Sequence, residues 1–178
     1  EVGLYIGLGS AAGGLIGTTI GGVLADWLKT RIAGGRILIG YICVTAMIPS
    51  TLAMVYADEL VIAYIMNFVL TLVSSMWAGV PPATANDLVM PRMRAIAGAF
   101  YILINTFIGL ALGPYVMGQL SDYFAANGAE PGEALRTAIA VSLGIFLITL
   151  VSLTLARRQL PKDEDSRIDR ARALGEAV

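Results

Sequence analysis

Long uncharged segments alternate with short charged connections along this chain. Five stretches contain no Asp, Glu, Lys or Arg: residues 2–25, 37–57, 60–86, 95–121 and 137–156. Each is about as long as the roughly 20 residues that a helix needs to cross the hydrocarbon core of a bilayer. The pattern predicts an all-α integral membrane protein with transmembrane helices at about residues 3–27, 37–56, 60–80, 95–121 and 137–156, followed by a polar tail at 157–178.

Composition agrees with this prediction, and the charges suggest a topology. Of the 178 residues, 57% are hydrophobic and 14% are charged, against about 25% charged in soluble domains. If the chain crosses five times, 11 of its 12 Lys and Arg residues fall on one side and only Arg136 on the other. By the positive-inside rule that side is the cytoplasm. We therefore expect a multi-pass protein of the cell membrane with a cytoplasmic C-terminal tail.

Glycines recur at every fourth position of the first uncharged stretch, at Gly9, Gly13, Gly17 and Gly21. Residues four apart share one face of a helix, so the glycines form a groove that lets another helix approach closely. The overlapping pattern Gly7-x-Gly9-x-x-Ala12 is a loose dinucleotide-binding fingerprint, but that motif needs a preceding strand and a soluble βαβ unit. We predict a helix–helix contact. The pattern leaves open whether the contact is static or moves.

Polar residues within the spans follow helical spacing. An amide in hydrocarbon must find a partner or water, so these residues either bond between helices or line a cavity. A cavity is favoured for Asn67 and Asn105, since both lie near mid-span, where transporters bind substrate. The candidate pathway residues are Asn67, Thr71 and Ser74 on the third span, Tyr101 and Asn105 on the fourth, and Ser10 and Thr18 on the first.

Two span ends share the pattern Gly-x-Leu-small-Asp, at Gly22 to Asp26 and at Gly118 to Asp122. A carboxylate at a helix C-terminus gains nothing from its own helix dipole, so we expect each Asp to face donors of another helix. The two copies fall at opposite membrane faces, as an inverted-topology repeat requires. Within the fourth span, Pro114 follows Gly113 and favours a kink, either a hinge of an outer gate or a fixed bend.

Two stretches resemble a known family. "GGVLADWLKTR" is similar to the degenerate second copy of the loop signature of the major facilitator superfamily, matching at Gly22, Leu24, Ala25, Asp26 and Arg31 and departing at Trp27, Lys29 and Thr30. Residues 91–124 resemble the penultimate helix of the spinster-like branch, with Arg92 and Arg94 at the start, Asn105 in the middle, a Gly113-Pro114 break and the Gly118 to Asp122 end.

The resemblance implies helices eight to twelve of a twelve-helix transporter with inverted repeats. These five would form most of its C-terminal six-helix bundle, with the N-terminal six-helix half and the seventh helix as partners. It also implies secondary transport by alternating access of a lipid-like substrate, such as a lysolipid or sphingoid lipid, often with proton coupling. The glycines, Asp and Arg residues of both motifs, together with Gly113 and Pro114, would then belong to the gates.

Several functions are disfavoured by what the sequence lacks. It contains no His, so neither a His-based triad nor a His-dependent zinc site forms from it, and it has no P-loop. We expect no enzyme, no cofactor, no metal site and no nucleic-acid partner. No uncharged stretch holds a carboxylate, so we expect any proton-coupling residue elsewhere. The alternatives are a proton-coupled transporter of drugs or small organic solutes, a channel subunit, and a non-transporting scaffold.

Overall fold

The computed structural model describes residues 2–173, and this part of the chain is helical, without strands. Glu1 and the last five residues of the predicted tail lie outside the described residues. The elements are α1 (Val2–Arg31), α2 (Gly35–Val55), α3 (Leu60–Ala78), α4 (Val80–Leu88), the 3₁₀ turn η1 (Pro91–Met93), α5 (Arg94–Ile104), the π-helix η2 (Asn105–Leu112), α6 (Gly113–Ala126), α7 (Pro131–Ser142) and α8 (Ile145–Ala173).

These elements join into five helical segments long and apolar enough to cross a membrane, at Gly3–Arg31, Gly35–Val55, Leu60–Leu88, Pro91–Ala126 and Pro131–Asp163. The prediction of an all-α membrane protein is therefore confirmed. Most of the segments are longer than the predicted spans because the helices continue into their polar flanks. The sequence pattern marks the apolar part of a helix and not its ends. At the C-terminus, α8 runs through Pro161 into the predicted tail.

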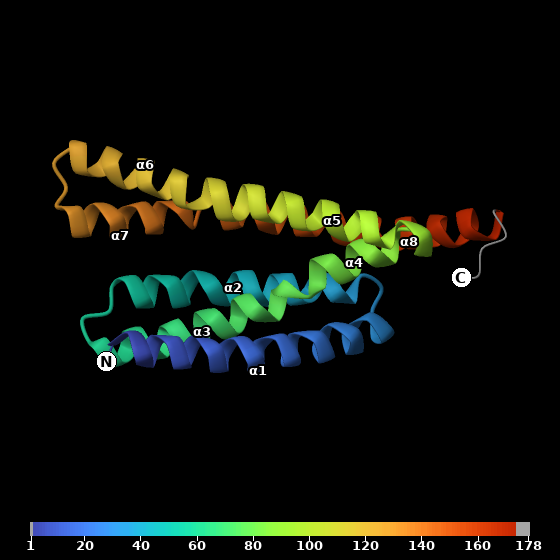
Figure 1. The fold of residues 1–178 in the computed structure, drawn as a ribbon, viewed down its shortest axis with the longest axis horizontal. Coiled ribbons are helices and arrows are strands. Elements are labelled where there is room, and N and C mark those ends of the chain that lie inside the picture. Colours follow the sequence, from blue (N-terminus) through green and yellow to red (C-terminus); the bar gives the residue numbers. More distant parts are fainter. Residues whose placement is uncertain (1, 174–178) are drawn as a thin grey trace.

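The helices form two groups that lie side by side along the long axis (Figure 1). In one group α1, α2 and α3 pack on one another, and in the other α6 packs on α7 while α8 continues from α7. Few elements join the groups. α2 packs on α8, and the short helix α4 contacts both α2 and α8 before the chain enters α5.

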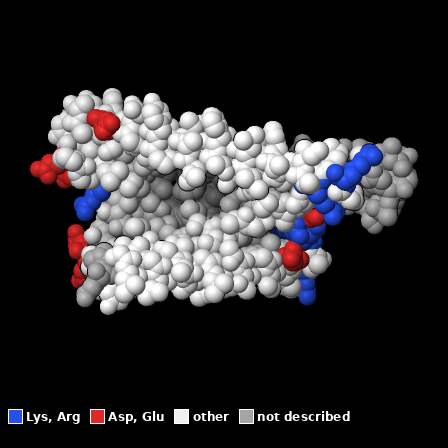
Figure 2. Space-filling view, viewed as in Figure 1, with Lys and Arg blue, Asp and Glu red and all other residues white. Residues whose placement is uncertain are grey.

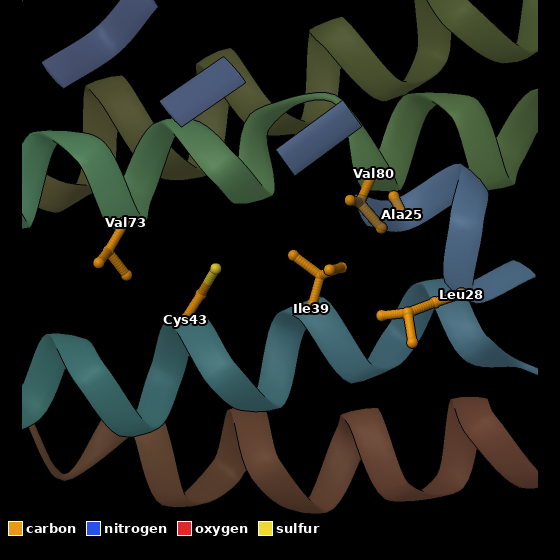
Figure 3. Close-up of a cluster of buried hydrophobic side chains, with 6 residues drawn as sticks. All are labelled: Ala25, Leu28, Ile39, Cys43, Val73 and Val80. Carbon is orange, nitrogen blue, oxygen red and sulfur yellow. The ribbon is translucent and has the colours of Figure 1, made fainter. Parts of the chain in front are cut away.

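Two small apolar clusters hold the helices together. The first contains Ala25, Leu28, Ile39, Cys43, Val73 and Val80 from α1 to α4 (Figure 3). The second, with Ile37, Val44, Leu153 and Leu160, joins α2 to α8. Most large apolar side chains of α5, η2 and α6 are exposed instead, such as Phe107 and Leu110. Such faces require lipid or further helices around them.

Candidate functional site

The backbones of α1 and α3 touch along the glycine line. A Cβ atom on Gly17 would lie 2.2 Å from the Leu72 carbonyl oxygen, and one on Gly21 would lie 2.3 Å from that of Met76. At Gly13 the nearest atom, the Phe68 carbonyl oxygen, is 3.0 Å away. A Cβ on Gly9 would have no neighbour within 4 Å. The predicted close contact thus covers three of the four glycines and opens beyond Gly13.

A polar pair bridges α1 and α3 where the glycine contact opens. The Asn67 side-chain amide donates a hydrogen bond to the Ser10 hydroxyl at 3.1 Å, and both residues are partly buried. Bonding between helices, one of the two interpretations of these residues, is thus present for Asn67. The residue lies near the middle of α3, as the sequence suggested.

The other hydroxyls of the predicted pathway bond to their own helices. Thr71 donates to the Asn67 carbonyl at 2.9 Å, Ser74 to the Thr71 carbonyl at 3.1 Å, and Thr18 to the Gly14 carbonyl at 2.9 Å. Because a backbone carbonyl already satisfies each donor, these hydroxyls need no partner on another helix. Their oxygens keep acceptor capacity toward a neighbouring group.

Tyr101 and Asn105 lie in the other helix group. Tyr101 is half-buried on α5, and Asn105 is the exposed first residue of η2. In the described part of the chain, α3 does not pack extensively on α5 or η2, so the structure does not bring Asn67 and Asn105 together. A hollow separates the groups on the face seen in Figure 2. On α2, Tyr41, Ile42, Thr45 and Ala46 lie together on a shallow, open part of the surface.

A cluster of four charged residues ties α1, α2 and α4 together at one end of the molecule. The Arg36 guanidinium bonds to Asp26 at 2.7 Å and to Asp87 at 2.5 Å, and Lys29 also pairs with Asp87. The Arg36 side chain is only 14% exposed. Lys and Arg residues gather mainly at this end, as Figure 2 shows. Charge-assisted bonds of this kind fix the three helix ends relative to one another.

A tight turn brings Arg36 to this cluster. Gly34 has a positive φ of 66°, a conformation that glycine adopts without strain. A Cβ on Gly35 would lie 2.2 Å from the Leu28 carbonyl oxygen. α2 therefore starts directly against the end of α1. A small cavity of about 90 Å³ lies beside this turn, with Lys29, Arg36, Thr84 and Leu160 in its lining.

The remaining motif residues are dispersed. The Arg31 guanidinium stacks 5.1 Å from the Trp27 ring centroid. Arg92 and Arg94 are exposed at η1 and the start of α5, and Gly113 and Pro114 open α6 directly after η2.

A Cβ on Gly22 or Gly118 would have no neighbour within 4 Å. Asp122 is exposed and makes no salt bridge within residues 2–173, whereas Asp26 makes one. The two motif copies therefore have different surroundings.

Sequence reasoning did not single out Lys29 and Arg36 as partners of Asp26 and Asp87. The signal was available, because all four residues lie within one turn of the edges of uncharged stretches on the same predicted membrane side. The hydrogen bond between the Tyr41 and Thr154 hydroxyls, at 2.7 Å, was also missed. It joins α2 to α8, which are too distant in sequence for a periodic pattern to relate them.

The described residues hold no group of three or more His, Cys, Asp or Glu side chains suited to a metal ion. Together, the five apolar helices and their charged ends define the class as a multi-pass α-helical membrane protein. No protein-family model matches the chain. The chain is 33% identical, over 143 residues, to an MFS-type efflux pump of Mycolicibacterium smegmatis.

That match covers 79% of this chain and 33% of the pump, so the chain spans about a third of the length of this relative. The abbreviation MFS denotes the major facilitator superfamily. The similarity is therefore to about a third of a protein that is named as a transporter of this superfamily.

Proposed function

We propose that these helices belong to the C-terminal half of a twelve-helix secondary transporter of the major facilitator superfamily that works by alternating access. The similarity to an efflux pump over 79% of the chain supports the class. The geometric observation that carries the proposal is the hollow between two helix groups with few links (Figure 2). In this proposal a seventh helix fills the hollow, and the N-terminal half packs on the exposed apolar faces.

The charged cluster acts in this proposal as a clamp at the cytoplasmic end. Arg36 holds Asp26 and Asp87 at once, so α1, α2 and α4 move together when that end opens or closes. The glycine contact is consistent with a bundle that stays together, because the backbones of α1 and α3 lie against each other at Gly17 and Gly21. The bundle then moves as a body against the other half, and the static interpretation of the glycine line is favoured.

The proposed substrate is a lipid-like amphiphile such as a lysolipid or sphingoid lipid. The polar stripes are uncharged and sparse, which suits a largely apolar molecule with few polar contacts. Asn67 and Asn105 would supply amide groups from the two helix groups, with Tyr101 one helical turn before Asn105. A drug or small organic solute, moved by proton-coupled transport, is the second candidate. It is favoured by the name of the similar protein, an efflux pump.

Flux into proteoliposomes tests the proposal. The full-length transporter is reconstituted and supplied with a fluorescent lysophosphatidylcholine or with ethidium. We expect saturable flux of one probe, and Asn67→Ala and Asn105→Ala should each lower its kcat/KM about fivefold, as loss of one hydrogen bond of about 1 kcal/mol does.

The matched control is Asn127→Ala. Asn127 lies at the end of α6 and bonds to the Tyr123 carbonyl at 2.7 Å, outside the predicted pathway. Its substitution should leave flux unchanged. Flux that rises linearly with probe concentration would indicate a channel, and absence of protein-dependent flux of both probes would contradict the proposal.

A further inference from the structure

The fourth apolar segment, Pro91–Ala126, contains a π-helix over eight consecutive residues, Asn105–Leu112. π-helices have hydrogen bonds from i to i+5, and most occur as single-turn bulges, frequently at functional sites. This one separates α5 from α6 within a single continuous segment. Its first residue is Asn105, and the residues directly after it are Gly113 and Pro114.

Pro114 gives a physical reason for the wider turn. In a regular α-helix its ring would press on the carbonyl of Leu110, and that carbonyl would have no N–H donor from Pro114. The preceding turn therefore has to open. Gly109 and Gly113 lie in the same stretch, and glycine lowers the preference for a regular α-helix. The local sequence disfavours the α conformation here without excluding it.

Within residues 2–173, few tertiary contacts hold η2 in the π conformation. All eight residues are exposed, and among the described residues no element other than its chain neighbours α5 and α6 packs extensively on it. α6 is anchored on α7, and α5 is anchored on α4. A change of conformation within η2 therefore moves two separately anchored segments relative to each other, with little packing against the other described helices to break.

The geometry of a change between π and α follows from the α-helical repeat. A π segment accommodates one residue more than an α-helix with the same orientation at both ends. If that residue is absorbed into a regular α-helix, the two ends rotate relative to each other by about 100° and separate by about 1.5 Å. Tyr101 and Asn105 would then face a different direction relative to Ser121 and Asp122.

We propose that η2 is a conformational switch, in which an exchange between π and α rotates the Tyr101–Asn105 face of α5 relative to α6 during the transport cycle. The inference rests on the proposed transport function. It assigns Pro114 the role of hinge rather than fixed bend. In this proposal the Asn105 side chain faces the hollow between the helix groups in one state of η2 and faces away from it in the other.

Two variants trap opposite states. Deletion of Ala111, made together with Pro114→Ala, removes both the extra residue and the proline ring, and gives a regular α-helix with the present orientation of α5 and α6. Pro114→Ala keeps every residue but removes the ring that disfavours the α-helix, so α5 is trapped in the rotated orientation. Both variants should retain a folded bundle, checked by size-exclusion chromatography, and both should lower flux of the transported probe by more than about tenfold, a loss of transition-state stabilisation above 1.36 kcal/mol.

The orientation of α5 is read by labelling of single cysteines with a membrane-impermeant maleimide. Cysteines are placed one at a time at Tyr101, Ile102, Leu103 and Ile104 in the full-length transporter, and the parent protein controls for Cys43, which is buried. The labelled positions should shift by one residue between Pro114→Ala and the Ala111 deletion. The parent should show one pattern with probe and the other without it.

The outcomes separate the switch from the transport function. An identical labelling pattern in the parent, in Pro114→Ala and in any folded deletion variant would overturn the switch, even if flux is saturable. A pattern that shifts in a protein without protein-dependent flux would support the switch as a structural property and contradict the proposed function. If the deletion variant does not fold, the parent with and without probe still decides. Exchange between π and α shifts the labelled positions between these two conditions, and an unchanged pattern in the parent overturns the switch.

Discussion

Individual glycines decide how closely the helices approach. Leaving a helix interior without a Cβ costs about 1 kcal/mol relative to Ala, and this cost is offset only where another backbone fills the space. Gly17 and Gly21 have such a neighbour, whereas Gly9 and Gly22 do not. The glycine spacing therefore predicted correctly which face of α1 contacts another helix. It included Gly9, which lies beyond the contact, because periodicity does not show where two helices diverge.

Gly21→Ala and Gly22→Ala form a matched pair at adjacent positions of α1. The new Cβ at position 21 would lie 2.3 Å from the Met76 carbonyl oxygen, so α1 and α3 must separate. We expect the free energy of unfolding to fall by about 1–3 kcal/mol, as is typical of overpacking, and the Tm in detergent to fall with it. Gly22→Ala, with open space around it, should keep or raise the Tm. Equal behaviour of the two variants would contradict the close contact.

The charged cluster gives a second prediction at the residue scale. Asp87→Asn removes the carboxylate that Lys29 and Arg36 share and leaves Arg36 with Asp26. Hydrogen bonds to charged groups contribute about 1.5–3 kcal/mol to stability. Lys29 and Asp87 are partly exposed, so we expect the free energy of unfolding to fall by an amount near the lower value. A double-mutant cycle with Arg36→Gln measures the coupling by thermal unfolding.

The control for this cycle is Asp122→Asn, at the other copy of the motif. Asp122 makes no salt bridge in the described part of the chain, so its substitution should leave the Tm unchanged. Additive effects of Asp87→Asn and Arg36→Gln would show that the pair contributes nothing to stability.

At the scale of elements, packing between helices differs from packing in a soluble core. Lipid tails are as apolar as Leu, so association of helices in the membrane depends on van der Waals contact and hydrogen bonds. The contact between α2 and α8 has van der Waals packing in the second apolar cluster, which contains Leu153, and a hydrogen bond between Tyr41 and Thr154. Gly40 lies in the same link, where a Cβ would come within 3.0 Å of the Leu153 side chain.

Leu153→Ala tests this link between the two helix groups. Leu153 is 8% exposed, and truncation leaves a cavity between α2 and α8. We expect the free energy of unfolding to fall by about 2–3 kcal/mol, the lower part of the range for soluble cores. The fall is smaller because a Leu side chain gains little by moving from lipid tails into a contact between helices. Val151→Ala, at a position 60% exposed on the same helix, is the control. Equal Tm values for the two variants in lipid nanodiscs would contradict the role of this link.

The sequence predicted the helical segments well because lipid imposes a strict length and polarity on each span. It did not predict the π-helix, although Gly113 and Pro114 marked the break. A proline indicates that a helix is disturbed without telling whether it kinks, widens or ends. Pairings such as Arg36 with Asp87, 51 residues apart, depend on how whole helices are arranged, which no local pattern contains.

For the whole molecule, the proposed transport function rests on the two helix groups and the hollow between them (Figure 2). The candidate residues Asn67 and Asn105 lie in separate groups, so any joint role in substrate binding requires a shared vestibule completed by further helices. The central claim is therefore alternating access by a larger assembly that contains this bundle. In the proposed cycle, the contacts at the glycine line and at Arg36 keep the bundle together, and the opening takes place at its borders.

Counterflow in proteoliposomes tests this claim most directly. Vesicles that contain the full-length transporter are loaded with unlabelled probe, and entry of the same labelled probe is followed at equal concentrations on both sides. Alternating access predicts faster labelled entry into loaded vesicles than into empty ones, because the returning carrier is occupied. Entry at the same or a lower rate in loaded vesicles would contradict the account and indicate a pore.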